Sequence, residues 1–388
     1  MINKKIAFIV VFLIFLLAGF STYFILSGKT GQNLLSPLSN YKPPTNNSTG
    51  GTTVDNEPKT EPCPINGALY SKTQKNKWDG RRPLAVMIEN HPDARPQSGM
   101  SSADVIFEAV AEGGITRFLN IFYCQDAPFI GPVRSARIYF VKLAQGFGNN
   151  PLYAHVGGAN TPGPADALGY LSDIGWSSNN DLNQFSVPFP YFWRDYERLP
   201  NRATEHTVYS STDKLWQYAK ANRGLTNVDD KGVSWDKNYI PWKFKDDAKV
   251  ADRGTATKID FGFWDNLASD FRVVWTYDKA NNIYMREDGG APQIDKDNNK
   301  QLSAKNVIVM FAKESPANDG YPGGHLLYGV IGSGDALIFQ DGNAIKGTWE
   351  KKTAEDQVRF YDENGKEVSL VRGQIFVEIL PIGNKVNY

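Results

Sequence analysis

The feature that most constrains this chain is an apolar segment at residues 6–26. Apart from positions 21–23 it contains only apolar and small residues, and Lys4 and Lys5 precede it. At about 1.5 Å of rise per residue, a helix of this length crosses roughly 30 Å of hydrocarbon. The lysines place its start in the cytoplasm under the positive-inside rule. We therefore expect residues 1–28 to be a single-pass membrane anchor with a short cytoplasmic start, followed by an extracytoplasmic globular part.

A cleaved signal peptide is the alternative interpretation of this segment. The apolar region of a signal peptide usually runs about 7–15 residues before a small-residue cleavage site, which is shorter than the run here. A lipoprotein signal would need cysteine where this chain has Phe20, because the lipid is attached to a thiol. The length favours an uncleaved anchor, and cleavage is left open.

Residues 29–62 have the composition of a flexible linker. They are rich in Pro, Asn, Ser, Thr and Gly, so they cannot bury enough apolar surface to fold. The two cysteines of the chain, Cys63 and Cys124, follow this linker. Outside the cytoplasm they can form one disulfide or remain two thiols. The chain has 42 basic and 42 acidic residues, so its net charge gives no signal for nucleic acid.

Two folded domains of different character are expected after the linker. Residues 63–228 alternate predicted strands (82–90, 115–123, 151–158) with predicted helices (101–114, 133–148, 163–175). This alternation favours a layered α/β domain with a mixed or parallel sheet. Residues 229–388 contain short predicted strands separated by turn sequences such as DGN and ENGK, which are typical of hairpins. We expect a β-rich domain there, with one possible helix within 261–271.

The predicted helix at 133–148 begins with Arg134, Ser135 and Arg137. The start of a helix bears positive partial charge, so two guanidiniums there require a negative group nearby. Free backbone N–H groups and two arginines together form a site for an external phosphate, sulfate or carboxylate.

The alternative occupant of this site is internal. Asp104, Glu108 and Glu112 are spaced by four, so they form one acidic stripe on the predicted helix at 101–114. Glu108 or Glu112 would then pair with the arginines in a structural salt-bridge network. The sequence gives the two interpretations equal weight.

Several polar residues lie in segments that follow predicted strands, where ligands bind in many α/β proteins. We take His155 and His206, with Glu108 and Glu112, as candidate acid–base residues. Together with Arg134, Ser135 and Arg137, the candidate ligand-binding residues are Asn90, Arg95, Gln97, Arg117 and Arg202. For a single histidine, an ordinary hydrogen-bonded role is more common than a catalytic one. The four histidines are not spaced as zinc ligands, and no phosphate-binding loop or G-x-S-x-G motif occurs, so we expect no metal, no cofactor and no serine hydrolase.

Long stretches of the sequence resemble a known family. The run RPLAVMIENHPDARPQSGMSSADVIFEAVAEGGITRFLNIFY, then IGPVRSARIYF and YAHVGGAN, resembles the YerB-like DUF3048 proteins over residues 82–220. The stretches GDALIFQDGNAIKGTWEKK and VRGQIFVEILP resemble the C-terminal domain of that family. The resemblance implies a two-domain extracytoplasmic envelope protein. It brings no established activity, and its motif positions coincide with most of the candidate residues above.

These observations support one leading hypothesis and two alternatives. The leading hypothesis is a membrane-anchored envelope protein that binds an anionic or carbohydrate ligand, such as a cell-wall polymer, through Arg134 and Arg137. The first alternative is an envelope glycan hydrolase that uses a glutamate and a histidine as acid and base. The second is a non-catalytic scaffold for wall-synthesis proteins, in which the charged cluster is purely structural.

Overall fold

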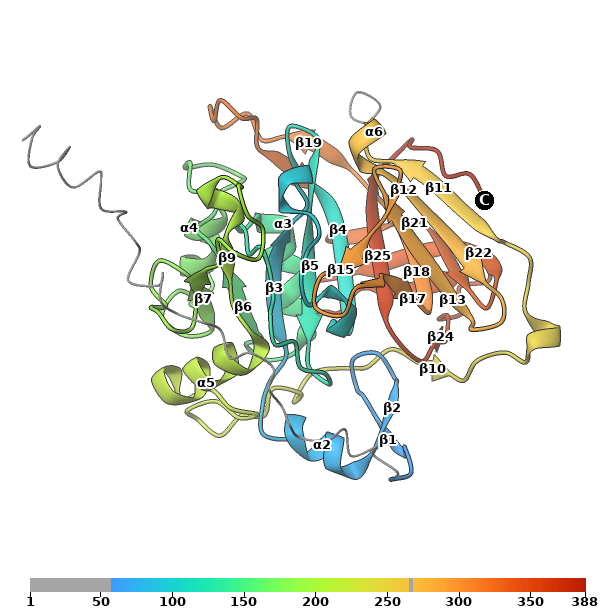
Figure 1. Cartoon of the computed structure of the whole chain (residues 1–388), viewed down its shortest axis with the longest axis horizontal. Coiled ribbons are helices and arrows are strands. Elements are labelled where there is room, and N and C mark those ends of the chain that lie inside the picture. Colours follow the sequence, from blue (N-terminus) through green and yellow to red (C-terminus); the bar gives the residue numbers. More distant parts are fainter. Residues whose placement is uncertain (1–56, 265–267) are drawn as a thin grey trace, which may run out of the picture. The chain divides into compact units, whose positions relative to one another are not determined.

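A mixed sheet of ten strands holds the core of the molecule (Figure 1). The computed structural model describes residues 57–264 and 268–388. We call residues 57–228 the N-terminal half and 229–388 the C-terminal half. In order across the sheet, the strands are β23 (Arg359–Asp362), β22 (Asn343–Lys351), β21 (Gly332–Gln340), β18 (Asn306–Ala312), β25 (Ile375–Pro381), β4 (Val105–Glu112), β5 (Ile115–Phe122), β3 (Leu84–Glu89), β6 (Leu152–His155) and β7 (Asp181–Asn183).

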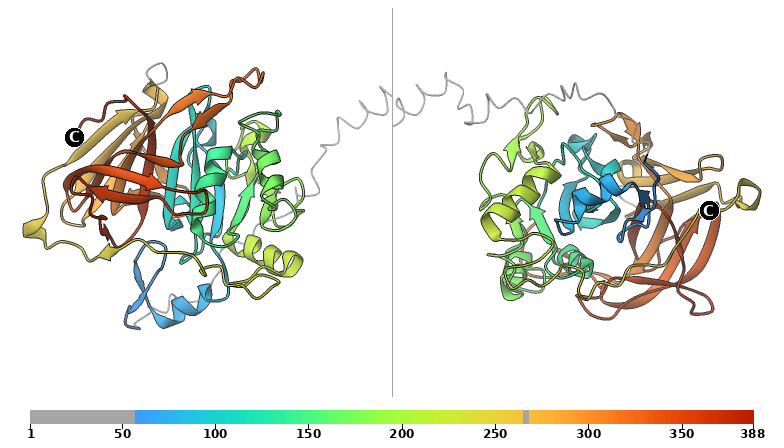
Figure 2. Two further views of the ribbon diagram at one scale, coloured as in Figure 1. Left: turned by 180° about the vertical axis from the view of Figure 1, so that it is seen from behind. Right: turned by 90° about the horizontal axis from the view of Figure 1, so that it is seen from below.

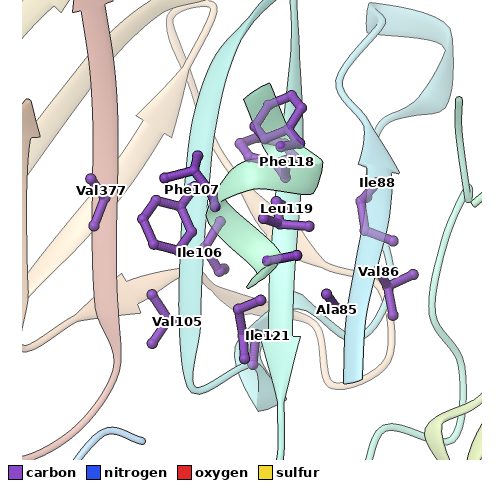
Figure 3. Close-up of a cluster of buried hydrophobic side chains, with 14 of the residues drawn as sticks. Ala85, Val86, Ile88, Val105, Ile106, Phe107, Phe118, Leu119, Ile121 and Val377 are labelled. Atoms are coloured by element: carbon purple, nitrogen blue, oxygen red, sulfur yellow. The ribbon is translucent and has the colours of Figure 1, made fainter. Parts of the chain in front are cut away.

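The two halves of the chain share this sheet. Strand β25 comes from the end of the C-terminal half and pairs in parallel with β4 of the N-terminal half. Ile375 lies opposite Val105, and Glu378 lies opposite Glu108. Figure 3 shows Val377 of β25 beside the apolar side chains of β4. The backbone hydrogen bonds of the sheet therefore run without a break from one half to the other.

Different layers cover the two faces of the central strands. A five-stranded sheet packs on one face, where Trp275 contacts Phe376 of β25 with ring centroids 5.0 Å apart. Its strands are β11 (Lys258–Gly262), β12 (Arg272–Asp278), β13 (Ile283–Asp288), β14 (Ala291–Pro292) and β17 (Ser303–Ala304). Helix α3 (Ile138–Ala144) covers the other face, where the Tyr139 hydroxyl donates to the Val110 carbonyl of β4 at 2.6 Å. The central strands are thus buried on both sides.

Shorter elements surround these layers (Figure 2). The other helices are α2 (Lys72–Trp78), α4 (Ala167–Asp173), α5 (Thr212–Arg223) and α6 (Ala268–Phe271), and the short 3-10 turns are η1 (Pro92–Ala94), η2 (Met100–Ser102), η3 (Gln145–Phe147), η4 (Thr204–His206) and η5 (Val250–Asp252). The paired short strands are β1 (Glu61–Pro62) with β2 (Leu69–Tyr70), β8 (Trp193–Arg194) with β9 (Val208–Tyr209), β10 (Phe244–Lys245) with β24 (Leu370–Val371), β15 (Ile294–Asp295) with β16 (Lys300–Gln301), and β19 (Glu314–Pro316) with β20 (Leu326–Tyr328).

The helix predicted at 101–114 is wrong, because residues 105–112 form strand β4. Seven of its eight residues are buried, so the polar–apolar alternation that marks a half-buried strand is missing. Gly113 and Gly114 have φ values of 59° and 79° and turn the chain directly into β5. Positive φ at both central positions is the signature of a tight hairpin rather than of a helix end.

The predicted start of the next helix is also wrong. Helix α3 begins at Ile138, and the backbone of its N-cap residue Arg137 is extended. The Arg134 N–H donates to Met87 O at 2.9 Å, and Ala136 N donates to Gly157 O at 2.9 Å. Because these backbone groups are committed to neighbouring segments, Arg134 and Arg137 do not lie one helical turn apart.

The prediction that the C-terminal half is rich in β-strands joined by hairpin turns is confirmed. Strands β12 and β13 form an antiparallel pair, as do β21 and β22. Between β21 and β22, Asp341 and Gly342 both have positive φ, as the DGN turn sequence predicts. The possible helix within 261–271 is the short α6.

Cys63 and Cys124 form a disulfide that ties the segment before α2 to the residues after β5. This settles the choice that the sequence left open. Of the expected linker, the structure describes residues 57–62, where Glu57 accepts hydrogen bonds from Thr73 and β1 is formed. The expected anchor at residues 6–26 lies outside the described residues. Within the part of the chain that is described, no helix is long and apolar enough to cross a membrane.

Candidate functional site

The acidic stripe of the sequence is split among three environments. Because it lies along a strand, residues four apart are about 13 Å from each other rather than one helical turn. Asp104 is buried beside the disulfide and accepts hydrogen bonds from the backbone N–H groups of Tyr123 and Cys124 at 2.7 and 3.0 Å. Burial raises the pKa of Asp104 to about 7. Glu108 and Glu112 lie further along β4 with different partners.

Glu108 belongs to a fully buried charge network between the halves, which we call the Arg286 network. Arg286 of β13 binds the carboxylate of Glu108, and it also lies 3.4 Å from Asp288 and 3.5 Å from Glu378. Burial raises the pKa of both Glu108 and Glu378. Arg286, Glu108 and Glu378 have side chains with 0% exposure, so Glu108 cannot reach a substrate from this position.

Three of the predicted ligand-binding residues extend this network. The Asn90 amide donates to Asp288 and to Thr116, both at 2.8 Å, and its oxygen accepts from Gln97 at 2.8 Å. Arg95 donates to the same oxygen at 3.0 Å and lies 3.2 Å from Asp288. Asn90 and Gln97 are completely buried. These side chains hold the loop after β3 against the five-stranded sheet.

Glu112 forms a second cluster with two arginines. Its carboxylate lies 2.8 Å from Arg117 Nη2 and 2.8 Å from Arg137 Nε, and Arg137 Nη2 makes a further contact. Burial opposes the charge of Glu112, but Arg117 and Arg137 outweigh it and lower its pKa to about 2. Arg117 also donates to the Ser135 carbonyl at 3.2 Å. For Arg137, the internal carboxylate that the sequence offered is therefore the observed partner.

Arg134 lies in a third group, which we call the Glu89 rim: Glu89, His91, Asp93, Arg134, Arg202 and His206. Glu89 Oε1 is 3.2 Å from Arg134 Nε, and Glu89 Oε2 is 2.9 Å from His206 Nδ1. Because a carboxylate only accepts, Nδ1 of His206 donates, and in the neutral ring Nε2 remains an acceptor. The Arg134 side chain is 26% exposed. Among the described residues, its guanidinium has one ion-pair contact, through Nε.

Local structure brings the rim together from four segments. Glu89 is the last residue of β3, His206 ends η4, and Arg134 lies in the extended segment that pairs with β3. His91 Nδ1 accepts from Asp93 N at 3.1 Å and so caps η1. The His91 and His206 rings stack with centroids 4.9 Å apart. Arg202 Nη1 lies 3.8 Å from Asp93 at the exposed margin.

His155 is separate from the rim and completely buried. Its Nδ1 is 2.6 Å from Gly157 O, and its Nε2 is 2.7 Å from Asp181 Oδ1. Both partners accept hydrogen bonds, so neither nitrogen is free to take a proton from a ligand. The structure therefore places His155 in a supporting role beneath the turn at Gly157.

The rim also contains a possible metal-ligand set. His91, Asp93 and His206 each offer a ligand atom, and these atoms lie within 4.8 Å of one another. Sequence spacing could not find this set, because His91 and His206 are far apart in the chain and meet only through tertiary structure. A second group, Cys63, Asp104 and Cys124, has its sulfur atoms committed to the disulfide.

Sequence reasoning missed residues whose roles depend on long-range contacts. Arg286 and Glu378 lie on strands of the C-terminal half that looked like ordinary hairpin and core segments. The signal available was a charged residue within an otherwise apolar strand, as in the run IFVEILP, which contains Glu378. Such a residue needs a buried partner of opposite charge.

Comparison with known proteins decides the family. Residues 70–226 match the model described as the N-terminal domain of DUF3048, a protein of unknown function, and residues 263–377 match its C-terminal domain. The chain belongs to the DUF3048 family. A relative from Bacillus subtilis (strain 168), named "Putative lipoprotein YerB", is 31% identical over 323 residues, covering 82% of this chain and 86% of the relative. The crystal structure of the Bacillus subtilis YerB protein matches with a TM-score of 0.67 and 27% identity, over 85% of this chain and all of that chain.

Proposed function

We propose that this DUF3048 protein is a membrane-anchored extracytoplasmic protein of the cell envelope that binds an anionic envelope polymer at the Glu89 rim. The observation that carries the proposal is the difference between the two arginines. Arg137 uses Nε, Nη1 and Nη2 in contacts with Glu112 and its neighbouring carbonyl. Arg134 has its described contact through Nε alone and is partly exposed, so its Nη groups can bind a phosphate or carboxylate in bidentate fashion.

The surrounding groups favour the same ligand chemistry. Arg202 and His91 have side-chain exposures of 38% and 34% and lie at the same rim. Beneath them, Glu89 pairs with Arg134, and His206 binds the other oxygen of the Glu89 carboxylate. A partly exposed cation group with a buried support is a preorganised site, which loses less entropy on binding than a set of free side chains.

Membrane anchorage follows from a second line of argument. The relative is named "Putative lipoprotein YerB", and the lipid of a lipoprotein is attached to a free cysteine. Both cysteines of this chain are used in the Cys63–Cys124 disulfide. The apolar segment at residues 6–26 is then the element that can hold the protein at the membrane, by insertion rather than lipidation.

The test is binding of the full-length protein in detergent to a phosphodiester-bearing wall polymer. Arg134→Ala should weaken binding by about 10-fold or more, because the lost bidentate contact is worth roughly 1.5–3 kcal/mol. Lys346→Ala is the matched control, since Lys346 is exposed on β22, which lies six strands away from β3 near the other edge of the ten-stranded sheet. Equal binding by wild type and Arg134→Ala would refute the assignment.

One observation favours a second function, hydrolysis of an envelope glycan. A carboxylate that orients a histidine, as Glu89 orients His206 at 2.9 Å, is an arrangement that activates a general base. Arg134 beside it could then stabilise a developing negative charge. Turnover of wall glycans by the wild type, abolished by His206→Ala, would support this function. No turnover across a broad panel of glycans would argue against it.

A further inference from the structure

A cleft of about 420 Å³ opens at the boundary between the two halves, away from the Glu89 rim. The residues after α3 and α4 form one wall, the end of β22 and the start of β23 form the other, and residues 238–240 lie between them. Its volume falls within the range of roughly 300–1,000 Å³ that is common for small-molecule sites. The residues predicted as a site from the sequence do not line it. We call it the inter-half cleft.

Close contacts hold the two walls of the inter-half cleft in fixed positions. Gly146 lies so close to the opposite wall that an added Cβ would be 2.7 Å from Asp356 O and 3.0 Å from the Cα of Gln357. The buried ammonium of Lys351 donates to the Ala354 carbonyl at 2.9 Å and also to the Asp356 carbonyl. Burial lowers the pKa of Lys351 to about 8. These contacts fix the loop of residues 352–356, so the cleft is largely preformed.

The cationic groups of the cleft, Arg359 and Lys352, are already paired. Arg359 donates to Glu367 at 2.7 Å and to the Pro241 carbonyl at 2.9 Å. Lys352 lies 3.7 Å from Glu350. An anion would therefore have to compete with carboxylates and carbonyls for these cations. The lining therefore disfavours an anionic ligand.

The remaining lining is aromatic and amide-rich. Tyr239 and Tyr361 are half-buried, and Asn149 and Asn238 add amide groups. Gln357 is 7% exposed, and its Nε2 donates to the Tyr239 hydroxyl at 3.2 Å. Its Oε1 is buried and accepts no hydrogen bond from any described residue. A buried acceptor without a donor is costly, so a ligand that brings a hydroxyl or amide N–H into the cleft is stabilised there.

We propose that the inter-half cleft binds a sugar residue of a glycan. The C–H face of a sugar ring packs on the half-buried tyrosines, while its hydroxyl or acetamido donor reaches Gln357 Oε1. Asn149 and the carboxylate of Glu350 supply further partners for the ring hydroxyls. This inference rests on the cleft alone and does not depend on anion binding at the Glu89 rim.

The test is isothermal titration of the full-length protein in a sugar-free zwitterionic detergent. The probes are two uncharged tetrasaccharides, the β-1,4-linked tetramers of N-acetylglucosamine and of glucose. We expect the wild type to bind at least one of them with a Kd of 1 mM or tighter (on the order of typical weak sites). Gln357→Leu and Tyr361→Ala should each weaken that binding by about 10-fold or more, in proportion to one lost hydrogen bond or one lost ring contact.

Controls separate the cleft from other effects. Tyr321→Ala removes an exposed tyrosine that lies between β19 and β20, and it should bind like the wild type. Asn238→Ala changes an exposed lining residue, and it should weaken binding even if Gln357→Leu fails to fold. The proposal is overturned if neither tetrasaccharide binds the wild type, or if the cleft variants that fold bind as well as Tyr321→Ala.

Discussion

The Arg286 network and the Glu89 rim contain similar side chains in opposite settings. Both join an arginine to carboxylates of the central strands, which lie in the middle of β4 and β25 in the network and at the end of β3 in the rim. Both also touch the loop that follows β3. In the network, Arg286 and Glu108 have no exposed side-chain surface. In the rim, Arg134 and Arg202 remain partly open to solvent. Residue type therefore does not distinguish charged side chains that hold the core together from those that a ligand can reach. The distinction depends on how deeply each side chain is buried.

Breaking the network should give the largest effect on stability. Arg286→Met leaves Glu108, Asp288 and Glu378 buried without their shared cation. We expect a loss of about 3–5 kcal/mol in the free energy of unfolding, as for other broken buried ion pairs. Guanidinium unfolding followed by tryptophan fluorescence measures it. Arg272→Ala removes the ion pair of a solvent-exposed arginine with Asp260, which keeps a second cation in Lys258; it is the control and should have a much smaller effect. Similar losses of unfolding free energy in Arg286→Met and Arg272→Ala would contradict the proposed difference between buried and exposed arginines.

The cluster of Glu112 with Arg117 and Arg137 is less buried than the Arg286 network, and its contribution to stability should depend on pH. Arg117 and Arg137 lower the pKa of Glu112 to about 2 against the opposing effect of burial. A lowered folded-state pKa contributes stability above the unfolded value of about 4.5, and this contribution is lost as the pH falls towards 2. Glu112→Gln should therefore cost about 2–3 kcal/mol at pH 7 and progressively less between pH 4.5 and 2. A difference from wild type that stays constant between pH 6 and pH 3 would refute this assignment.

At the rim itself, substitutions should affect stability less. Arg134→Ala removes one partly exposed partner of Glu89, while His206 still holds the carboxylate. We expect a loss of about 1 kcal/mol in unfolding free energy, together with the larger binding loss described above. If stability falls by several kcal/mol and binding is unchanged, Arg134 belongs with the structural charges, as the scaffold hypothesis requires.

The smallest effect is expected at the outer margin. Arg202 and Asp93 are 3.8 Å apart, with side chains 38% and 53% exposed. Arg202→Ala should change stability by less than about 0.5 kcal/mol, because exposed ion pairs contribute little. Thermal unfolding at low and high salt measures it, and 1 M salt should abolish even this small difference. A loss comparable to that of Arg134→Ala would mean that the rim is more closed than its exposure indicates.

Local signals predicted much of the fold. The strands around Val86, Leu119 and Ala154 and the hairpin at Gly342 were found because apolar runs and turn residues act over a few positions. Strand β4 was missed because a spacing of four fits one face of a helix and also one face of a strand. With both of its faces buried, the pattern had no polar alternation to decide between them.

The candidate site was predicted less completely, for a related reason. Glu112 was correctly named as one possible partner for the arginines, and it binds Arg137. The partner of Arg134 is Glu89, from a different strand, and Glu108 turns instead to Arg286. Which carboxylate meets which arginine depends on strand order and on the face of the sheet. Strand order and sheet face are properties of the assembled sheet, and the spacing of residues along the sequence does not reveal them.

The pairing of β25 with β4 sets an order of events for the folding of this chain. Strand β25 (Ile375–Pro381) follows the nine other strands of the ten-stranded sheet along the chain, so it is synthesised after them. Before β25 pairs with it, β4 is an unpaired edge of the sheet, and its residue Glu108 has no residue opposite it on that side. An N-terminal half expressed alone would therefore expose the unpaired backbone N–H and C=O groups of β4, which favours aggregation. Completion of the chain, rather than of either half, is the step that closes the core.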